Sequence, residues 1–224
     1  MLINFDVRSQ LKDIFDKELK GKVKLKLFSQ AIGCDTCLTA EELLKEVSHI
    51  EPHKVELSIH SPVLERELAK TYGIERVPTI VIEGEKDYGI RYIGLPAGLE
   101  FTTLVQAMLH VSKGQAKLTE STLKMLESVD IPMEIMVFVT TSCGYCPSAA
   151  IMAINFAIAN DNIKATIIDA SENADLAEKF QVVGVPKIVI NNGLVEFVGA
   201  QPENAFLGYL ISAYQKMKKE ALDG

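Results

Sequence analysis

Hydrophobic and polar positions alternate along the chain with two different periods, and these predict strands and helices in turn. In residues 23–28, valine and leucine alternate with lysine, a period of two that predicts a strand with one polar face. The second half of residues 133–139 is apolar at every position, which predicts a strand buried on both faces. In residues 6–19, Leu11, Phe15 and Leu19 recur at helical spacing and predict a helix with one apolar face.

The same patterns predict the rest of the fold. Predicted helices cover residues 6–19, 40–47, 62–72, 99–111, 120–128, 151–159, 175–180 and 203–219. Predicted strands cover residues 23–28, 54–60, 79–82, 88–93, 133–139, 165–168, 187–190 and 195–198. Thr39, with Glu42 at capping-box spacing, is expected to cap the helix at 40–47. Strands that alternate with helices and end in a pair of strands predict an α/β fold, with a mixed four-stranded sheet in each of two units.

The sequence itself repeats, which is why two units are predicted. Two cysteine pairs recur 109 residues apart and two Val-Pro dipeptides recur 108 residues apart. They are Cys34/Cys37 with Cys143/Cys146, and Val77-Pro78 with Val185-Pro186. We therefore predict two copies of one fold, at residues 1–115 and 116–224. The join at 112–117 is short and polar, so the units are expected to pack together rather than swing freely.

The four cysteines are the candidate chemistry, and they occur only as the two C-x-x-C pairs. A structural disulfide framework would close long loops, whereas these pairs close almost nothing. Zinc requires four ligands, but each pair offers two and no histidine is near either. A dithiol redox site is therefore favoured. A metal or iron–sulfur centre shared between chains stays open as the alternative.

Cys143 is expected at the N-terminus of a helix, with Cys146 in the first turn and Pro147 tolerated there because it gives up an N–H that lacks a partner. Unpaired amides and the helix dipole favour a thiolate at such a position. Cys143 would attack a substrate disulfide, and Cys146 would resolve the mixed disulfide. Asp35 adjoins Cys34 and opposes a thiolate there, so Cys143 is expected to be the more reactive cysteine.

Composition narrows the classes of partner. The chain of 224 residues is 48% hydrophobic and 24% charged, which is typical of globular proteins. Its net charge of −7 argues against binding to nucleic acid. The N-terminal residues lack the pattern of a signal peptide, and no apolar run reaches membrane-spanning length, so a cytoplasmic location without membrane association is expected.

The order of elements, a C-x-x-C that opens the first crossover helix and a Val-Pro before the next strand together resemble the thioredoxin fold. Two such units, with Cys143-Gly144-Tyr145-Cys146-Pro147 in the second, are similar to the glutaredoxin-like protein disulfide oxidoreductases of thermophiles, which belong with the protein disulfide isomerases. This resemblance implies that the two units form one continuous sheet. It also implies that Val77-Pro78 and Val185-Pro186 are cis bonds facing their cysteines.

The resemblance further implies a function. The four cysteines would be catalytic, and protein substrates would contact Val77, Pro78, Val185, Pro186 and Tyr145. No cofactor would be bound, and the redox-active disulfides would be recharged by a thioredoxin reductase-like flavoprotein that uses NADPH. Reduction, formation and isomerisation of disulfides in cell redox homeostasis all stay open. A module that binds client proteins or a metal or iron–sulfur centre is the alternative function.

Two further positions bear on these expectations. Many thioredoxins carry a buried acid six residues before the first cysteine, but Phe28 and Val137 occupy those positions here. The proton acceptor is therefore missing or supplied from elsewhere. The aromatic and aliphatic residues between Phe206 and Tyr214 predict core packing, with a subunit contact in a homodimer as the alternative.

Overall fold

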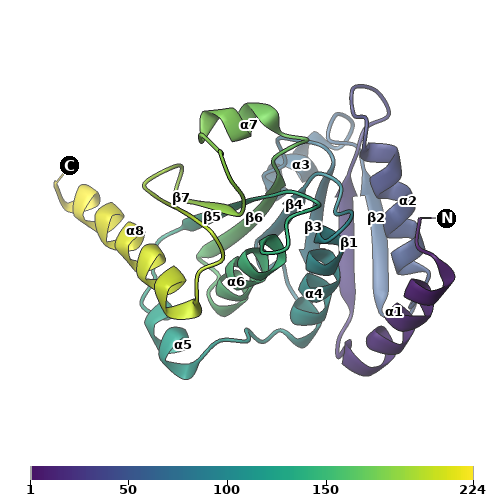
Figure 1. Cartoon of the computed structure of the whole chain (residues 1–224), viewed down its shortest axis with the longest axis horizontal. Helices are drawn as coiled ribbons and strands as arrows, with labels where there is room; N and C mark the ends of the chain where they lie inside the picture. The colour runs from purple at the N-terminus through teal and green to yellow at the C-terminus, as the bar shows by residue number, and fades with distance from the viewer. Residues whose placement is uncertain (1, 224) are drawn as a thin grey trace.

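The computed structural model describes residues 2–223, and the side chains of residues 2–221. The described residues form one eight-stranded mixed sheet with helices on both faces (Figure 1). The strands are β1 (Val23–Phe28), β2 (Val55–His60), β3 (Thr79–Glu83), β4 (Ile90–Ile93), β5 (Met133–Val139), β6 (Ile163–Asp169), β7 (Lys187–Ile190) and β8 (Val195–Val198). The helices are α1 (Phe5–Glu18), α2 (Cys37–Ser48), α3 (Arg66–Tyr72), α4 (Glu100–Lys113), α5 (Glu120–Leu126), α6 (Cys146–Ala159), α7 (Ala174–Lys179) and α8 (Glu203–Asp223).

The strand order, β2-β1-β3-β4-β6-β5-β7-β8, repeats one arrangement twice. In each half a central strand pairs in parallel with its successor and antiparallel with the next strand, which in turn pairs antiparallel with the last. The halves join where β4 pairs in parallel with β6, from Ile90 opposite Ala165 to Ile93 opposite Ile168. The predicted fold, two tandem thioredoxin-like units in one continuous sheet, is confirmed. The exact boundary at residues 115 and 116 stays a prediction.

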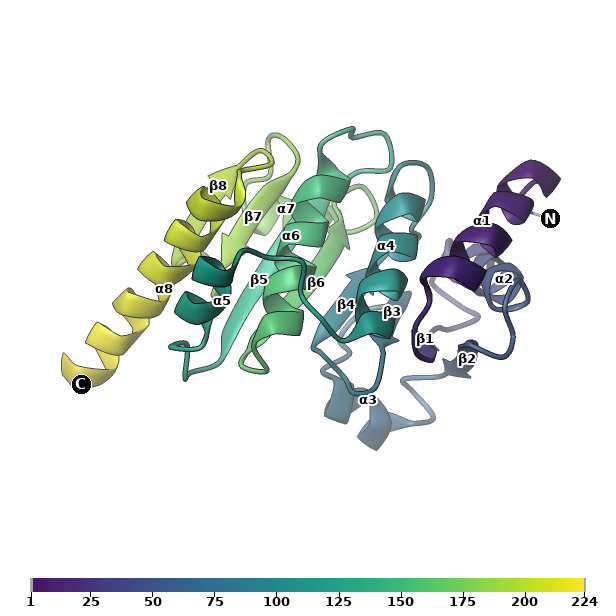
Figure 2. The same ribbon diagram turned by 90° about the horizontal axis from the view of Figure 1, so that it is seen from below.

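The core is divided between the two faces of the sheet. One large cluster of buried apolar residues lies on the face covered by α1, α2, α4, α6 and α8. Two small clusters lie on the opposite face, one under α3 and one under α7. Figure 2 shows α4, α6 and α8 along one side of the sheet and α3 on the other. Because both faces of β5 are covered, this strand is apolar at almost every position, as its sequence predicted.

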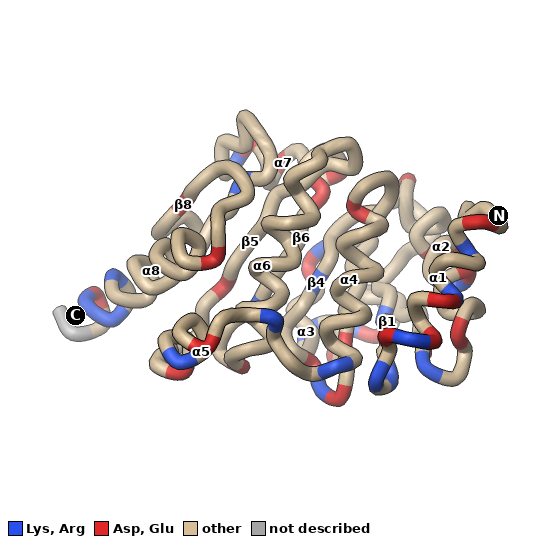
Figure 3. The backbone as a smooth tube through the Cα atoms, turned by 60° about the horizontal axis from the view of Figure 1, so that its bottom comes forward, with Lys and Arg blue, Asp and Glu red and all other residues tan. Residues whose placement is uncertain are grey.

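The helix α6 lies at the centre of the large core and carries no charged residue. It packs against α4 of the first half, so the two halves share a core as well as a sheet. Over the part of the chain that the structure describes, acidic and basic residues are interspersed rather than gathered into a basic face (Figure 3). None of the described helices is both long and apolar enough to cross a membrane.

Two helix starts differ from the sequence prediction. The helix α2 begins at Cys37, so Thr36 rather than Thr39 occupies the N-cap position, and its hydroxyl makes no cap bond. The prediction was wrong because the cysteine turn runs directly into the helix, which places Thr39 inside the first turn. The helix α3 begins at Arg66 rather than residue 62, because the Glu65 carboxylate accepts the Ser61 backbone N–H and holds residues 61–65 in a turn.

Candidate redox site

Both cysteine pairs are disulfide-bonded and occupy equivalent places in the fold. The Cα atoms are 5.5 Å apart in Cys34–Cys37 and 5.4 Å apart in Cys143–Cys146, ordinary values for a disulfide. Each pair lies between the C-terminal end of a central strand, β1 or β5, and the start of the following helix. The first cysteine of each pair is partly exposed, whereas the second is buried as the first residue of its helix. This arrangement suits an attacking first cysteine and a sheltered, resolving second cysteine.

The sulfur of Cys143 receives a hydrogen bond from the start of α6. The backbone N–H of Cys146 donates to Sγ of Cys143 over 3.1 Å. This amide is one of the unpaired donors at a helix N-terminus, and the 14-residue helix adds the positive end of its dipole. Both effects favour a thiolate in the reduced protein. At Cys34 the described residues provide no matching hydrogen bond to sulfur.

The two Val-Pro bonds are cis, as the resemblance implied. Each proline lies directly before a strand that runs antiparallel to the central strand, at the end where the cysteine turn begins. Thr79, after the first proline, pairs with Phe28, and Lys187, after the second, pairs with Phe138. The prolines therefore lie at the same end of the sheet as the cysteines. Contact of Val77, Pro78, Val185 and Pro186 with a substrate stays a prediction.

The surface beside Cys34 is hollowed and apolar. A depression of about 620 Å³ is lined by Cys34 together with Leu38, Ile59, His60 and Leu64, among others. Leu38 is 67% exposed and Leu64 is 85% exposed, values that are high for leucine. A large apolar side chain that stays in contact with water beside a reactive cysteine marks a surface suited to a partner.

The second site has a smaller exposed apolar surface. Tyr145, which lies between Cys143 and Cys146, is 75% exposed, and Val183 is 97% exposed two residues before Val185. Tyr145 is thus accessible to a substrate, and its predicted contact with one stays a prediction.

Sequence reasoning missed Glu100, a buried acid close to the second site. It is the first residue of α4 and is 0% exposed, and neither carboxylate oxygen has a hydrogen-bond partner among the described residues. Burial raises the pKa of Glu100 to about 7, and the negative charge of Asp169 raises it further in the same direction. The adjacent Leu99 donates its backbone N–H to the carbonyl of Thr141 over 2.9 Å, two residues before Cys143.

The neighbours of Glu100 place it at the end of the sheet that carries the second cysteine turn. Asp169, whose charge acts on Glu100, is the last residue of β6 and pairs with Val139 at the end of β5. Tyr92 is also buried there, and its hydroxyl lacks a partner among the described residues. Burial is the main cause that raises the pKa of Tyr92, and Glu100 contributes to it. Phe28 and Val137 are both fully buried, so neither supplies an acid at the usual thioredoxin position.

The position of Glu100 explains why no sequence signal revealed it. Phe101 and Phe206 are equivalent in the repeat, so the position equivalent to Glu100 is Ala205, and the repeat does not preserve the acid. Glu100 belongs to the first half but lies near the redox turn of the second, through the packing of α4 against α6. Only the contact between the halves makes it a site residue.

The comparisons with known proteins agree with this geometry. A thioredoxin domain family model matches residues 133–212, the second half of the chain. The crystal structure of a protein disulfide oxidoreductase from Aeropyrum pernix superposes with a TM-score of 0.88 and 30% identity, over 96% of this chain and 95% of that chain. The structure of the alkylhydroperoxide reductase AhpF from Enterococcus faecalis superposes with a TM-score of 0.84 and 27% identity, over 94% of this chain and 100% of that chain.

The alkyl hydroperoxide reductase of the same type from Staphylococcus epidermidis is 28% identical over 194 residues, which cover 85% of this chain and 34% of the relative. The chain thus spans about a third of the length of such curated relatives. The fold and its two C-x-x-C disulfides define a thioredoxin-fold redox protein. Through its full-length match to the Aeropyrum pernix structure, the chain belongs to the protein disulfide oxidoreductase family.

Proposed function

We propose that the chain exchanges dithiols and disulfides with protein substrates, through both cysteine pairs. In the reductive direction the Cys143 thiolate attacks a substrate disulfide, which breaks the substrate S–S bond and releases one substrate sulfur as a thiolate. Cys146 then loses its proton and attacks Sγ of Cys143. This step releases the second substrate thiolate and forms the Cys143–Cys146 disulfide, so two electrons pass to the substrate.

Glu100 is suited to accept the proton of Cys146. Its pKa of about 7 leaves it partly ionised near neutral pH, which is the condition for a group that takes and returns a proton. Its burial excludes bulk water from competing for that role. Glu100 would thereby replace the acid that is missing at Val137.

One observation carries the choice of polypeptides as substrates: the apolar hollow beside Cys34. A small disulfide such as oxidised glutathione has little apolar surface to bury. A polypeptide segment with a cysteine beside apolar residues can cover Leu38, Ile59 and Leu64 while its sulfur reaches Cys34. The predicted alternative, a module that binds clients without redox turnover, would use the same surface and is separated by turnover alone.

The oxidised pairs need a source of electrons, and we infer a flavoprotein reductase that uses NADPH. The resemblance of the sequence to the family implies it, and relatives named as part of alkyl hydroperoxide reductase support a place in a chain of reductases. The chain itself would bind no cofactor. The cytoplasmic location and the homodimer expected from the sequence stay predictions.

The same relatives favour a second candidate function, in which the substrate disulfide belongs to a peroxide-reducing protein. The chemistry at the cysteine pairs would be unchanged, and only the partner would differ.

The test is reduction of insulin by dithiothreitol in the presence of the chain. Four forms are compared: wild type, Cys34→Ser/Cys37→Ser, Cys143→Ser/Cys146→Ser, and the variant that lacks all four cysteines. We expect turnover in the first three and none in the last. Binding of insulin without turnover by the wild type would contradict the proposal and favour the binding module. Faster reduction of a peroxidase disulfide than of insulin would support the second candidate.

A further inference from the structure

A short segment of the second half reaches the redox turn of the first half. Glu172 lies between β6 and α7, and its carboxylate accepts the hydroxyl of Thr36 over 2.5 Å and the backbone N–H of Leu95 over 2.8 Å. Thr36 lies inside the Cys34–Cys37 turn, directly before the second cysteine. A carboxylate from the second half is therefore hydrogen-bonded to the turn that carries the first disulfide.

The same segment also holds the other side of the first site. Arg76 directly precedes Val77-Pro78, and its guanidinium binds both carboxylate oxygens of Asp175, over 2.9 and 2.5 Å. The two parallel hydrogen bonds fix the direction of the arginine as well as its position. The contact raises the pKa of Arg76 and lowers that of Asp175. Residues 172–175 thus contact the cysteine turn and the Val77-Pro78 loop, the two borders of the first site.

This segment is itself anchored in the second half. The buried carboxylate of Asp169 accepts the backbone N–H groups of Ser171, over 2.8 Å, and of Glu172, over 3.2 Å. The buried side chain of Asn173 donates to the Asp169 carbonyl over 2.9 Å. Gly94 of the first half packs so closely here that an added Cβ would lie 2.8 Å from Cβ of Asp169. The two contacts with the first site therefore come from a fixed support.

The second redox site has no equivalent support. The residue equivalent to Thr36 is Tyr145, whose side chain is 75% exposed. The residue equivalent to Arg76 is Gly184, which has no side chain to make such a contact. The asymmetry follows from the architecture, since the second half ends the sheet at β8 and no third unit follows it among the described residues.

We propose that Glu172 and Asp175 are positioning residues of the first redox site, so that this site is built from both halves of the chain while the second is not. Glu172 holds the Cys34–Cys37 turn and keeps a negative charge beside it. Asp175, through Arg76, holds the Val77-Pro78 loop. This inference rests on the proposed thiol–disulfide exchange and adds that the second half sets the reactivity of the first.

The reactivity of Cys34 is measured with 5,5′-dithiobis(2-nitrobenzoate) in the Cys143→Ser/Cys146→Ser background. The Cys34 thiolate attacks the reagent and releases one thionitrobenzoate anion. Cys37 then loses its proton, displaces the second anion and closes the disulfide. The pH dependence of the first step reports the thiolate at Cys34, which a purely structural contact would not shift.

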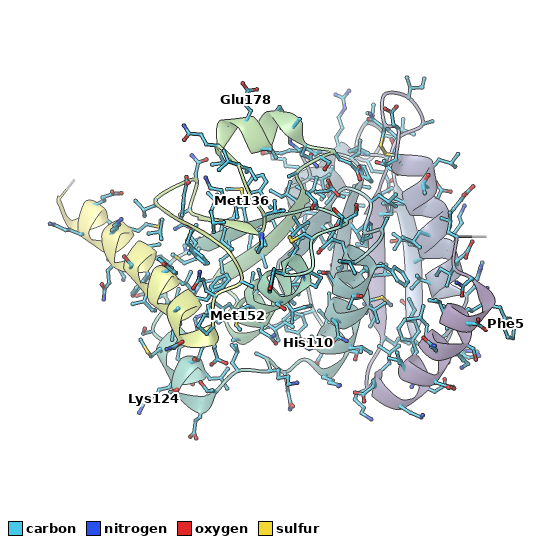
Figure 4. All side chains as sticks on the ribbon, in the orientation of Figure 1. Phe5, His110, Lys124, Met136, Met152 and Glu178 are labelled. Atoms are coloured by element: carbon cyan, nitrogen blue, oxygen red, sulfur yellow. A yellow bond between two sulfur atoms is a disulfide. The ribbon has the colours of Figure 1, made fainter. Side chains whose placement is uncertain are left out.

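For Glu172→Gln we expect the midpoint of this profile to fall by about half a pH unit, because a like charge beside the thiolate is removed but was partly screened by water. Below the midpoint the rate should rise about threefold, as a shift of that size requires. Glu178→Gln is the matched control, since Glu178 points away from α7 in Figure 4 and carries the same charge. In the Thr36→Val background the shift should shrink, because the carboxylate is no longer held at the turn.

Equal midpoints in Glu172→Gln and Glu178→Gln would overturn the role of Glu172. So would an equal shift at Cys143 in the Cys34→Ser/Cys37→Ser background. Should Glu172→Gln fail to fold, Thr36→Val removes the same hydrogen bond from the other side and must itself change the rate at Cys34. Failure of the wild type to react with the reagent at either pair would instead contradict the proposed function.

Asp175 is tested with a disulfide-bonded peptide as substrate in the same Cys143→Ser/Cys146→Ser background. Asp175→Asn should lower kcat/KM for the peptide by about threefold or more, because the Val77-Pro78 loop borders an extended substrate. The small reagent should react at an unchanged rate, since it does not reach that loop. Equal effects on both substrates, or none on either, would overturn the role of Asp175.

Discussion

At the scale of single residues, the two redox turns differ in the charges and dipoles around their first cysteine. An amide of α6 points at the sulfur of Cys143. The Cys34 turn instead carries Asp35 and is bonded to the carboxylate of Glu172. Positive partial charge stabilises a thiolate and negative charge destabilises it, so the equivalent cysteines have opposite environments.

Cys143 should therefore react faster than Cys34 at mildly acidic pH. The measurement is alkylation of the reduced protein with iodoacetamide near pH 6, with each cysteine quantified by mass spectrometry of its peptide. Asp35→Asn serves as the control, because loss of that charge should raise labelling of Cys34 and leave Cys143 unchanged. Equal labelling of the two, or faster labelling of Cys34, would contradict the prediction.

Glu100 should make the stability of the protein depend on pH. Its pKa of about 7 in the folded state lies above its ordinary value of 4.5, so between these values the unfolded chain has lost the proton that the folded chain keeps. The free energy of unfolding therefore falls as the pH rises through this window, by about 3 kcal/mol in all, and levels out above it. Glu100→Gln should remove this fall.

The measurement is urea unfolding of wild type and Glu100→Gln at several pH values from 5 to 8. Glu120→Gln is the control, because Glu120 lies in the first turn of α5 but is exposed. A buried glutamine has its own cost, but that cost is the same at every pH, so the slope is diagnostic. Parallel curves for wild type and Glu100→Gln would show that Glu100 does not titrate in this range.

At the scale of elements, local pattern was enough where an element is stabilised by its own sequence. The strands β7 and β8 lie where the hydrophobic pattern predicted them, at residues 187–190 and 195–198. The pattern failed at the start of α2, because a capping signal at Thr39 competes with a disulfide turn that reaches Cys37. It also could not reveal Glu100 or Glu172, since each acts on the redox turn of the other half through contacts that the folded sheet creates.

The exposed apolar residues of α2 and the turn before α3 should bind polypeptide substrates. Leu64→Ser should lower kcat/KM for insulin at the first site several-fold, because loss of one buried leucine contact costs about 1.5–3 kcal/mol when the contact is complete. Reaction with the small nitrobenzoate reagent should be unchanged. Met125→Ser is the control, since Met125 is 46% exposed on α5, outside the residues that line this hollow. An equal loss in both variants would show that the hollow does not bind the substrate.

At the scale of the whole molecule, the continuous sheet makes each half part of the other's site. The helix α4 closes the first half and also delivers Glu100 to the second redox turn. The segment after β6 belongs to the second half and supports the first turn. The shared sheet at β4 and β6 holds both contacts in place. A cut between the halves would therefore remove an acid from one site and a support from the other.

The redox potential of the Cys143/Cys146 pair follows from the balance of these effects. The amide of Cys146 stabilises the Cys143 thiolate and hence the reduced form, which makes the disulfide a better oxidant. Glu100, buried and close to neutrality in its titration, places negative charge nearby at higher pH and acts in the opposite direction. We therefore expect a potential between the glutaredoxin range, about −200 to −230 mV, and the thioredoxin value of about −270 mV.

Equilibration of the Cys34→Ser/Cys37→Ser variant against a series of glutathione or dithiothreitol buffers measures this potential. Adding Glu100→Gln should move it toward less negative values at pH 8 more than at pH 6, because the removed charge is present only above its pKa of about 7. A couple in the expected range can pass electrons in either direction, which suits a general exchanger of thiols and disulfides. A value near −120 mV, about that of a dedicated oxidant, would contradict this and restrict the chain to forming disulfides.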